Sequence, residues 1–544
     1  MSQNSYKFKR NIDIGSLDAE NDRFLIAAFV DKNDLTLLSD MSNPKSILIG
    51  RTGSGKSALI KYLEKNEQYI KRIDPESISL RHLSNSDIIQ YFKKLNVKLD
   101  LFYKVLWKHV FIVELIKLYY DNNIDKSKSI IDWLKNQLPN KAKQSSLDYL
   151  EKWEDKFWEN TEYRIKEMET SLENRFKGEL GGQVDIKELF KVLGKVDKES
   201  KDSNTIKYEV INKAQKVVNE SQIEHINNIL DIMETKMFIK SQKKFFIIID
   251  DLDKEWVSNT IVYDLLKALI ETIKDLSRIS NFKIVIALRT NIHKKILKSN
   301  LVRGVQREKY NHLYLDIKWS ESELMQLLNN RLRELMRGTY TSDSPTVEDV
   351  LPEAKSHSKK QISGFDYLVQ RTFMRPRDVI DFFNKCIKHA DGKTRISREI
   401  LRLAEDEYSH ERLRALNDEW IENYGNLFCL YGFLKGKKDG FKRDEIVVVA
   451  EEYFVEIIGN DEIKNLNDEL QSFFNNYGND FEAIKLLNKV LITLYETGLL
   501  GIKIGPETKT EYIYESYTAI ESSDLTPVSK FYVHPMFKKA LRIK

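Results

Sequence analysis

The sequence of 544 residues predicts an α/β fold with a parallel sheet, into which a long helical region is inserted. The first observation is a short apolar run, Ser46–Ile49, which leads into a glycine-rich loop and then into a helical pattern. The second is a pair of wholly apolar runs, Phe245–Ile249 and Lys283–Leu288, that flank a helical segment; this order is typical of a buried parallel sheet. The third is the stretch from about residue 84 to 242, which has an almost entirely helical pattern.

Composition narrows the class of protein. Hydrophobic residues make up 41% of the chain, so it can form cores and is not disordered overall. Lys and Arg number 87 against 83 Asp and Glu; this near balance neither supports nor excludes a nucleic-acid partner. The two cysteines, Cys386 and Cys429, cannot form a disulfide framework or a cysteine zinc site. Because no signal peptide and no apolar run of 18 residues is present, we expect a soluble cytoplasmic protein that makes no membrane contact.

The glycine-rich loop fits the phosphate-binding pattern G-x-x-x-x-G-K-[ST] at Gly50–Ser57. In this pattern the glycines let backbone N–H groups turn toward phosphate oxygens, Lys56 adds a positive charge, and the Ser57 hydroxyl can ligate Mg²⁺. The flanking strand and helix disfavour the alternative of a glycine-rich surface turn. The predicted nucleotide-binding residues are Gly50, Arg51, Thr52, Gly53, Ser54, Gly55, Lys56, Ser57 and Ala58.

A second acidic site follows the apolar run Phe245–Ile249. We expect Asp250 to hold Mg²⁺ through water, and either Asp251 or Asp253 to orient or deprotonate the attacking water. The alternative is that these acids only cap the next helix. Asp is shorter than the Glu used in many fast ATPases, so slow turnover is expected.

The other elements follow from their hydrophobic spacing. Asp18 to about Val30 predicts a helix, and Leu101–Tyr120 predicts a buried one because it is apolar on most sides. Two long helical patterns on either side of a polar break at Gly178–Asn204 favour an intramolecular helical hairpin that serves as a partner surface. An oligomerising coiled coil is the alternative, but the spacing is too irregular for sustained heptads.

Toward the C-terminus, Glu321–Met336 predicts a lid helix. A helix, an alternating pair at Leu499–Ile504 and Glu511–Ser516, and a final short helix then resemble a winged helix. The predicted domains are residues 1–83 (N-terminal helix and first part of the core), 84–242 (helical insertion), 243–320 (second part of the core), 321–403 (helical lid) and 404–544 (winged-helix-like domain).

Four motifs carry a resemblance to known families: GRTGSGKS at the loop, IDDLDKEWV at Ile249–Val257, ALRTN at Ala287–Asn291, and RPRDVIDF at Arg375–Phe382. Together they resemble the STAND and KAP branches of the additional-strand P-loop NTPases, which are related to the AAA+ proteins. The resemblance spans most of the chain. It implies a nucleotide domain with an additional strand, a helical lid, a C-terminal winged helix, and ATP and Mg²⁺ as cofactors.

The resemblance also implies roles for several arginines. Arg289 or Asn291 falls at the position that senses the γ-phosphate from the sheet, and Arg375 and Arg377 fall where a lid reaches the nucleotide. Arg303 or Arg307 is a candidate arginine finger for a neighbouring subunit. The alternative interpretation for each of these arginines is a surface charge that is solvated or ion-paired. The basic run at residues 435–443 is either a contact to DNA phosphates or a solvated loop.

These observations predict a slow, Mg²⁺-dependent ATPase that acts as a nucleotide-controlled switch or motor in a bacterial assembly. Anti-phage defence is the setting that the resemblance suggests. Its expected partners are further copies of the chain or an effector protein, with nucleic acid as a candidate for the C-terminal domain. The alternatives are a DNA-binding loader resembling origin-recognition ATPases, and a scaffold that binds ATP without hydrolysing it.

Overall fold

A computed structural model describes residues 6–77, 99–120, 129–138, 140–154, scattered positions between 156 and 170, and residues 220–239, 242–252, 256, 261–298, 308–338, 345–355, 361–476, 483–505, 507–516 and 520–544. These residues form two compact units. The sheet unit comprises Asp31–Arg51 and Lys56–Ile317, and the C-terminal unit comprises Met1–Val30, Thr52–Gly55 and Lys318–Lys544. The predicted break at Gly178–Asn204 and the candidate fingers Arg303 and Arg307 lie outside the described residues.

The sheet unit is built on five parallel strands in the order β2-β3-β4-β1-β5. The strands are β1 (Ile47–Gly50), β2 (Tyr69–Ile73), β3 (Phe245–Ile249), β4 (Phe282–Arg289) and β5 (Tyr314–Asp316). β4 lies between the strand before the glycine loop and the strand before the acids, so the predicted fold with an additional strand is confirmed. All five residues of β3 are buried, as expected for an inner strand of a sheet covered on both faces.

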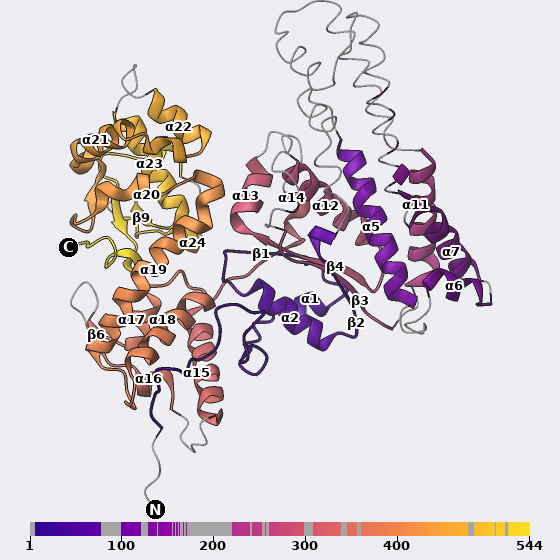
Figure 1. Ribbon diagram of the computed structural model, residues 1–544, viewed down its shortest axis with the longest axis horizontal. Coiled ribbons are helices and arrows are strands. Elements are labelled where there is room, and N and C mark those ends of the chain that lie inside the picture. The colour runs from indigo at the N-terminus through magenta and orange to yellow at the C-terminus, as the bar shows by residue number, and fades with distance from the viewer. Residues whose placement is uncertain are drawn as a thin grey trace, which may run out of the picture. The chain divides into compact units, whose positions relative to one another are not determined.

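Helices cover the two faces of this sheet (Figure 1). α1 (Asp34–Ser39) and α2 (Lys56–Asn66) lie on one face, and α5 (Asp100–Tyr120) and α12 (Val262–Leu276) lie on the other. The further helices of this unit are α6 (Ile130–Lys135), α7 (Lys141–Trp153), α11 (Glu220–Ile232) with a π-helical turn at Met233–Met237, α13 (Thr290–Lys298) and α14 (Glu308–Asn311).

α5 is buried as predicted, although the sequence places it in the insertion. Trp107 is 1% exposed, and its indole N–H donates to the carbonyl of Leu265 on α12 at 2.9 Å. Its ring also packs edge-on against Trp256. The first described helix of the insertion therefore belongs to the hydrophobic core of the sheet unit.

Among the described residues of the C-terminal unit, α15 is the first helix. Its first part contains α15 (Glu321–Gly338), α16 (Val347–Val350), the short strands β6 (Ala354–Lys355) and β7 (Gln361–Ile362), α17 (Gly364–Val369), α18 (Pro376–His389) and α19 (Arg398–Tyr424). Its second part contains α20 (Phe428–Tyr431), β8 (Phe441–Lys442), α21 (Arg443–Gly459), α22 (Asp468–Asn475), α23 (Ala483–Thr497), β9 (Leu500–Lys503), α24 (Ile513–Ser516) and β10 (Lys530–Val533).

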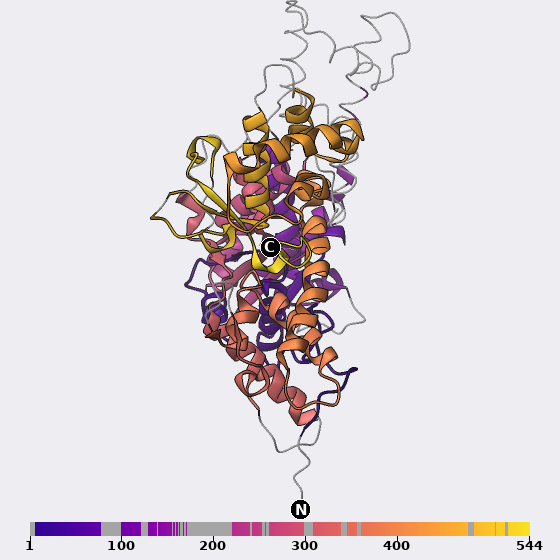
Figure 2. The same ribbon diagram turned by 90° about the vertical axis from the view of Figure 1, so that its left-hand side faces the viewer.

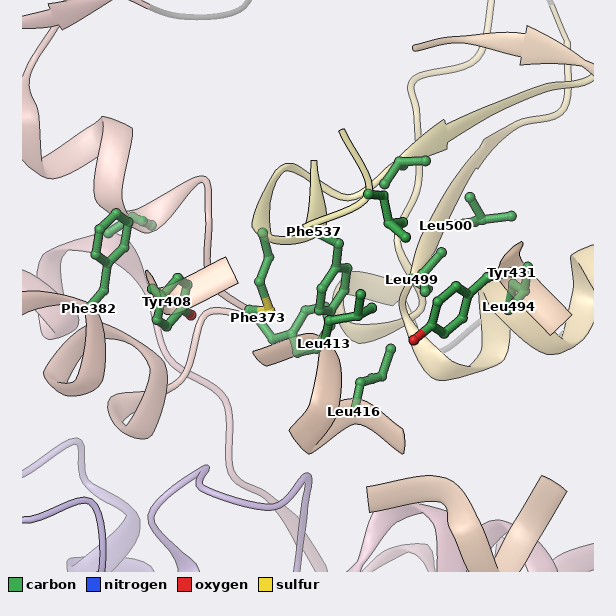
Figure 3. Close-up of a cluster of buried hydrophobic side chains, with 14 of the residues drawn as sticks. Phe373, Phe382, Tyr408, Leu413, Leu416, Tyr431, Leu494, Leu499, Leu500 and Phe537 are labelled. Atoms are coloured by element: carbon green, nitrogen blue, oxygen red, sulfur yellow. The ribbon is translucent and has the colours of Figure 1, made fainter. Parts of the chain in front are cut away.

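One core joins both parts of this unit. Figure 3 shows Phe373, which precedes α18, beside Phe537 from the C-terminal segment, with ring centroids 5.8 Å apart. Phe382 of α18 stacks on Tyr408 of α19 at 4.7 Å. The yellow C-terminal segment lies close to the orange helices in both ribbon views (Figures 1 and 2), and the backbone N–H of Ala540 donates to Ser409 of α19.

One predicted element is wrong, and another is correct only in part. Asp18–Val30 forms turns, not a helix, because acidic side chains in this segment bond the local backbone instead: Asp22, for example, accepts from the N–H of Phe24 at 3.1 Å. Asp22 is also held by the buried guanidinium of Arg331. The predicted pairing of Leu499–Ile504 with Glu511–Ser516 is correct only in part. The backbones of Ile502 and Glu511 exchange two hydrogen bonds, but Ile513–Ser516 is helical and β9 forms its ladder with β10. Burial favours the ladder with β10, because Phe531 and Val533 of β10 are fully buried and pair with residues of β9.

Among the described residues, no helix combines the length and the apolar character that crossing a bilayer requires.

The burial of Trp107 gives a stability prediction. Trp107→Ala should lower the free energy of unfolding by about 3–5 kcal/mol, because it leaves a cavity and removes the hydrogen bond to the carbonyl of Leu265. Urea denaturation of the whole chain measures the change. Trp133→Ala, at a half-buried tryptophan of α6, is the matched control and should cost less. Equal costs for the two variants would mean that α5 is not part of the core of the sheet unit.

Candidate functional site

The glycine-rich loop has the backbone that a phosphate-binding loop needs. β1 ends at Gly50 and α2 begins at Lys56. Gly53 and Gly55 have φ values of +78° and +98°, in the left-handed region that only glycine enters without strain. A Cβ atom on Gly53 would also lie 2.6 Å from the Cβ of Arg377. Both glycines are therefore required by the observed path of the loop.

Lys56 closes the two ends of this loop. Its Nζ donates to the carbonyl oxygens of Gly50 at 2.9 Å and Arg51 at 3.1 Å. Arg51 itself is buried, and Ser57 and Ala58 occupy the first turn of α2, where they are half-buried. The ammonium group thus lies next to the loop backbone, where a phosphate would need a counter-charge.

Two hydroxyl oxygens of the loop make no hydrogen bond to the described residues. The Oγ1 of Thr52 and the Oγ of Ser54 are buried, and neither has a hydrogen-bond partner within the described part of the chain. Buried polar atoms are normally hydrogen-bonded, so such atoms in a loop of this type fit a phosphate ligand. The residues of the loop therefore suit the predicted nucleotide.

Asp250 follows β3 directly and is 6% exposed. Its Oδ1 accepts from the N–H of Asp251 at 2.9 Å. Its buried Oδ2 accepts no hydrogen bond from the described residues, although Nη2 of Arg72 lies 3.5 Å away. An available carboxylate oxygen at this position fits a hard cation such as Mg²⁺, held directly or through water.

Asp251 has a left-handed backbone, with φ of +59°. Asp and Asn tolerate this region better than longer residues do, because their short polar side chains can bond locally. The backbone therefore gives a reason for an aspartate, and not a glutamate, at this position. The other predicted base, Asp253, lies outside the described residues.

Arg289 is the last residue of β4 and pairs in register with Gly50 of β1. Neighbouring strands lie about 4.8 Å apart, so Arg289 is next to the start of the loop. β4 also pairs with β3, the strand that ends before Asp250. The loop, Arg289 and Asp250 thus share the carboxyl edge of one sheet, whereas Asn291 lies in the first turn of α13.

Arg375 and Arg377 lie at the N-terminus of α18, in the unit that also contains Thr52–Gly55. Arg375 is 2% exposed; its Nε pairs with Asp378 at 2.8 Å, and its Nη1 donates to the carbonyl of Thr52 at 2.5 Å and lies 3.4 Å from Glu419. The backbone N–H of Arg377 donates to the carbonyl of Gly53 at 3.3 Å.

The charges around α18 are strongly coupled. Burial alone would lower the pKa of Arg375, but the carboxylates of Asp378 and Glu419 outweigh it and raise this pKa. Burial alone would raise the pKa of Asp378, yet Arg375 and Arg412 lower it. The pKa of Arg377 is lowered by burial and by the neighbouring cations Arg375 and Arg412. Arg377 is thus the member of this group for which an added anion would relieve repulsion.

Two residues near the site were missed by the sequence analysis. Trp319, just after β5, donates its indole N–H to the carbonyl of Ser54 at 2.8 Å, and Arg72 of β2 lies 3.5 Å and 3.9 Å from the carboxylates of Asp250 and Asp251. A tryptophan close to the end of strand β5 was the sequence feature that could have indicated the first contact. The second depends on the pairing of β2 with β3, which no local pattern reveals.

Comparisons with known proteins agree with this architecture. Residues 33–317 match the KAP family P-loop domain, and residues 322–417 match the FunZ-associated C-terminal helical domain. The putative transposon gamma-delta 80.3 kDa protein of Escherichia coli (strain K12) is 24% identical over 427 residues. This match covers 76% of the chain but only 52% of the relative, so the chain spans about half of that protein's length.

Two solved structures resemble the chain only distantly. They are a Walker-type ATPase of Pyrococcus abyssi (11% identity, TM-score 0.35) and the ORC2 protein of Aeropyrum pernix in ADPNP–ADP complexes (10% identity, TM-score 0.34). Each comparison covers 95% of this chain and 96% of the other. Likeness at this level adds nothing to the fold described above. The KAP match, in contrast, spans slightly more than half of the 544 residues and includes the loop, the acids and every strand of the parallel sheet. The chain therefore belongs to the KAP family of P-loop NTPases.

Proposed function

We propose that this protein is a slow, Mg²⁺-dependent ATPase. The observation that carries the proposal is the shared carboxyl edge of β1, β4 and β3, which presents the phosphate loop, Arg289 and Asp250 in that order. Phosphoryl transfer is catalysed mainly by positioning and by charge stabilisation, and this edge carries groups for both.

Each residue has a defined part in the proposal. The loop N–H groups, Lys56 and Ser57 hold the phosphates and the metal, and Asp250 holds the metal from the other strand. Bound Mg²⁺ would neutralise phosphate charge. Asp251 accepts the proton of the attacking water, and Arg289 stabilises negative charge that develops on the γ-phosphate.

Three variants test the proposal by binding and turnover together. Lys56→Ala should abolish ATP binding, Asp250→Asn should weaken Mg²⁺-dependent binding, and Asp251→Asn should keep binding but lose most turnover. Asn preserves the left-handed backbone at residue 251, so that variant changes chemistry and not conformation. Calorimetry and phosphate release are the measurements.

The matched controls are Lys65→Ala on the exposed side of α2 and Asp275→Asn on α12. Neither control should change binding or turnover. If the parent binds ATP but releases no phosphate, the alternative of a non-hydrolysing scaffold replaces the ATPase. Unchanged affinity in folded Lys56→Ala would remove the loop from the proposal altogether.

We extend the proposal to a nucleotide-controlled switch or motor in a bacterial assembly. The anti-phage setting rests on analogy with the families that the sequence resembles. A switch needs different free energies of contact in its two nucleotide states. Arg377 supports this extension because its side chain lies against Gly53 of the loop and because it is the cation whose repulsion an anion would relieve. One charge-assisted contact to a γ-phosphate contributes roughly 1.5–3 kcal/mol.

The switch is tested by mass photometry and scattering of the protein with ATP, with ADP and without nucleotide. ATP should change the conformation or the assembly state, and ADP should not. Arg377→Ala should erase this difference while nucleotide still binds, whereas Arg414→Ala, at an exposed arginine of α19, should preserve it. Identical profiles of the parent in all three conditions would leave a simple ATPase.

A second candidate function, binding of duplex DNA, is favoured by a basic surface in the C-terminal unit. The predicted basic run lies beside the last residues of the sequence: the N–H of Gly436 donates to the carbonyl of Leu541, and that of Lys544 donates to Lys437. The nearby Asp439 is already paired with Lys538 at 2.6 Å. This pairing brings together the exposed cations Lys435, Lys438, Lys539 and Arg542.

The topology of this region agrees with the proposed winged helix. The order is β8, α21, α22, α23, β9, α24 and β10, and the three strands form an antiparallel sheet in the order β8-β10-β9. α23 is largely buried, so it does not offer a helix face for reading bases. The contacts proposed here are therefore to phosphates and carry no sequence specificity.

The double variant Lys435→Glu with Lys438→Glu should weaken binding to a 30-base-pair duplex, followed by fluorescence anisotropy. Each lost phosphate contact should lower the slope of log affinity against log salt by about 1. Lys393→Glu with Arg402→Glu, two exposed cations elsewhere in the unit, is the control. Equal binding by both double variants would exclude this surface as the DNA site.

A further inference from the structure

Three successive carbonyl groups of the phosphate loop accept hydrogen bonds from the C-terminal unit. The carbonyl of Thr52 accepts from Nη1 of Arg375 at 2.5 Å, and that of Gly53 accepts from the backbone N–H of Arg377 at 3.3 Å. The carbonyl of Ser54 accepts from the indole N–H of Trp319 at 2.8 Å. The loop residues and the three donors all belong to this one unit.

These bonds also determine where the loop N–H groups point. The described peptide bonds are trans, and in a trans peptide the C=O of one residue and the N–H of the next point in opposite directions. When the carbonyls of residues 52–54 face their donors, the N–H groups of residues 53–55 must face away from them. Those N–H groups belong to the set that a phosphate-binding loop presents to the nucleotide.

We propose that Arg375 and Trp319 are positioning residues that hold the loop with its N–H groups turned toward the phosphate side. In this proposal Arg375 acts on the nucleotide through the carbonyl of Thr52, and Trp319 acts through that of Ser54. Neither side chain needs to touch a phosphate. The inference rests on the proposed nucleotide binding at this loop and assigns a role to Trp319 that no motif indicated.

Both donors are held by contacts other than the loop. Arg375 is buried and ion-paired with Asp378 and Glu419, so its guanidinium is not free to follow the loop. Trp319 packs against the hydrophobic core of the C-terminal unit. These donors are already ordered, so little conformational entropy is lost when they bond the loop. They can therefore stabilise one loop conformation over others.

The positioning role differs measurably from a role in sensing the γ-phosphate. The backbone N–H groups of such loops cradle the α- and β-phosphates, which ADP and ATP share. Loss of the positioning bonds should therefore weaken ADP and ATP alike. Loss of a direct γ-phosphate contact should weaken ATP alone.

The experiment uses the full chain with Trp319→Phe, which keeps an aromatic ring and removes the N–H donor. Calorimetry should give affinities about fivefold weaker for both ADP and ATP, as expected for one hydrogen bond. In the absence of nucleotide, hydrogen exchange of a peptide covering residues 50–58 should be faster than in the parent. Trp133→Phe, at a half-buried tryptophan of the sheet unit, should change neither quantity.

Arg375→Lys is the second variant, since lysine keeps the positive charge beside Asp378 but cannot reach two partners with a planar fork. It should also weaken ADP and ATP equally and should speed exchange of the same peptide. Unchanged affinity and exchange in both folded variants would overturn the proposal, and so would a loss confined to ATP. In those cases the failure of Lys56→Ala to bind would show that the proposed nucleotide site itself still stands. A parent that binds neither nucleotide would overturn both.

Discussion

A parallel sheet that is buried on both faces brings the carboxyl ends of its strands to a single edge, and the candidate site depends on this constraint. In this protein the wholly buried strand β3 can exist only because α12 and α5 cover one face and α1 and α2 the other. The placement of β4 between β1 and β3 then puts Arg289 between the glycine loop and Asp250. If β4 ran antiparallel to its two neighbours, Arg289 would lie at the opposite edge of the sheet from the glycine loop and Asp250.

The loop also depends on a second source of order, the charged cluster at the start of α18. Arg375 is a cation removed from water, and its burial is tolerated because Asp378, Glu419 and the carbonyl of Thr52 surround it. Removing one member of such a buried pair typically costs about 3–5 kcal/mol, since the other charge is left without compensation. The loop backbone is hydrogen-bonded to this cluster through the carbonyl of Thr52, so it is held by an ion-pair network that is costly to break.

In the acidic part of the site, the backbone conformation restricts which side chain can occupy position 251. Asp251 lies in the left-handed region, where a short side chain is favoured, and its N–H is used to hold one oxygen of Asp250. The other oxygen of Asp250 faces Arg72 from the neighbouring strand. An acid pair arranged in this way offers one fixed carboxylate for the proposed Mg²⁺ and one short carboxylate as the proposed base.

Local patterns in the sequence determined the strands β1, β3 and β4, the loop and its glycines, and the acids after β3, because each depends on hydrophobic spacing or on residue types within a few positions. They also predicted the burial of Leu101–Tyr120, which α5 confirms. Local spacing was misleading for Asp18–Val30, where side chain to backbone bonds and Arg331 replace the helix. It was right only in part for β9, which bonds Glu511 at Ile502 but forms its ladder with β10. The tertiary structure alone decided that Arg72 faces the acids and that Trp319 and Arg375 bond the loop carbonyls. Those contacts join residues up to 323 positions apart, and a contact between distant segments depends on how their elements pack, which periodicity along the chain does not encode.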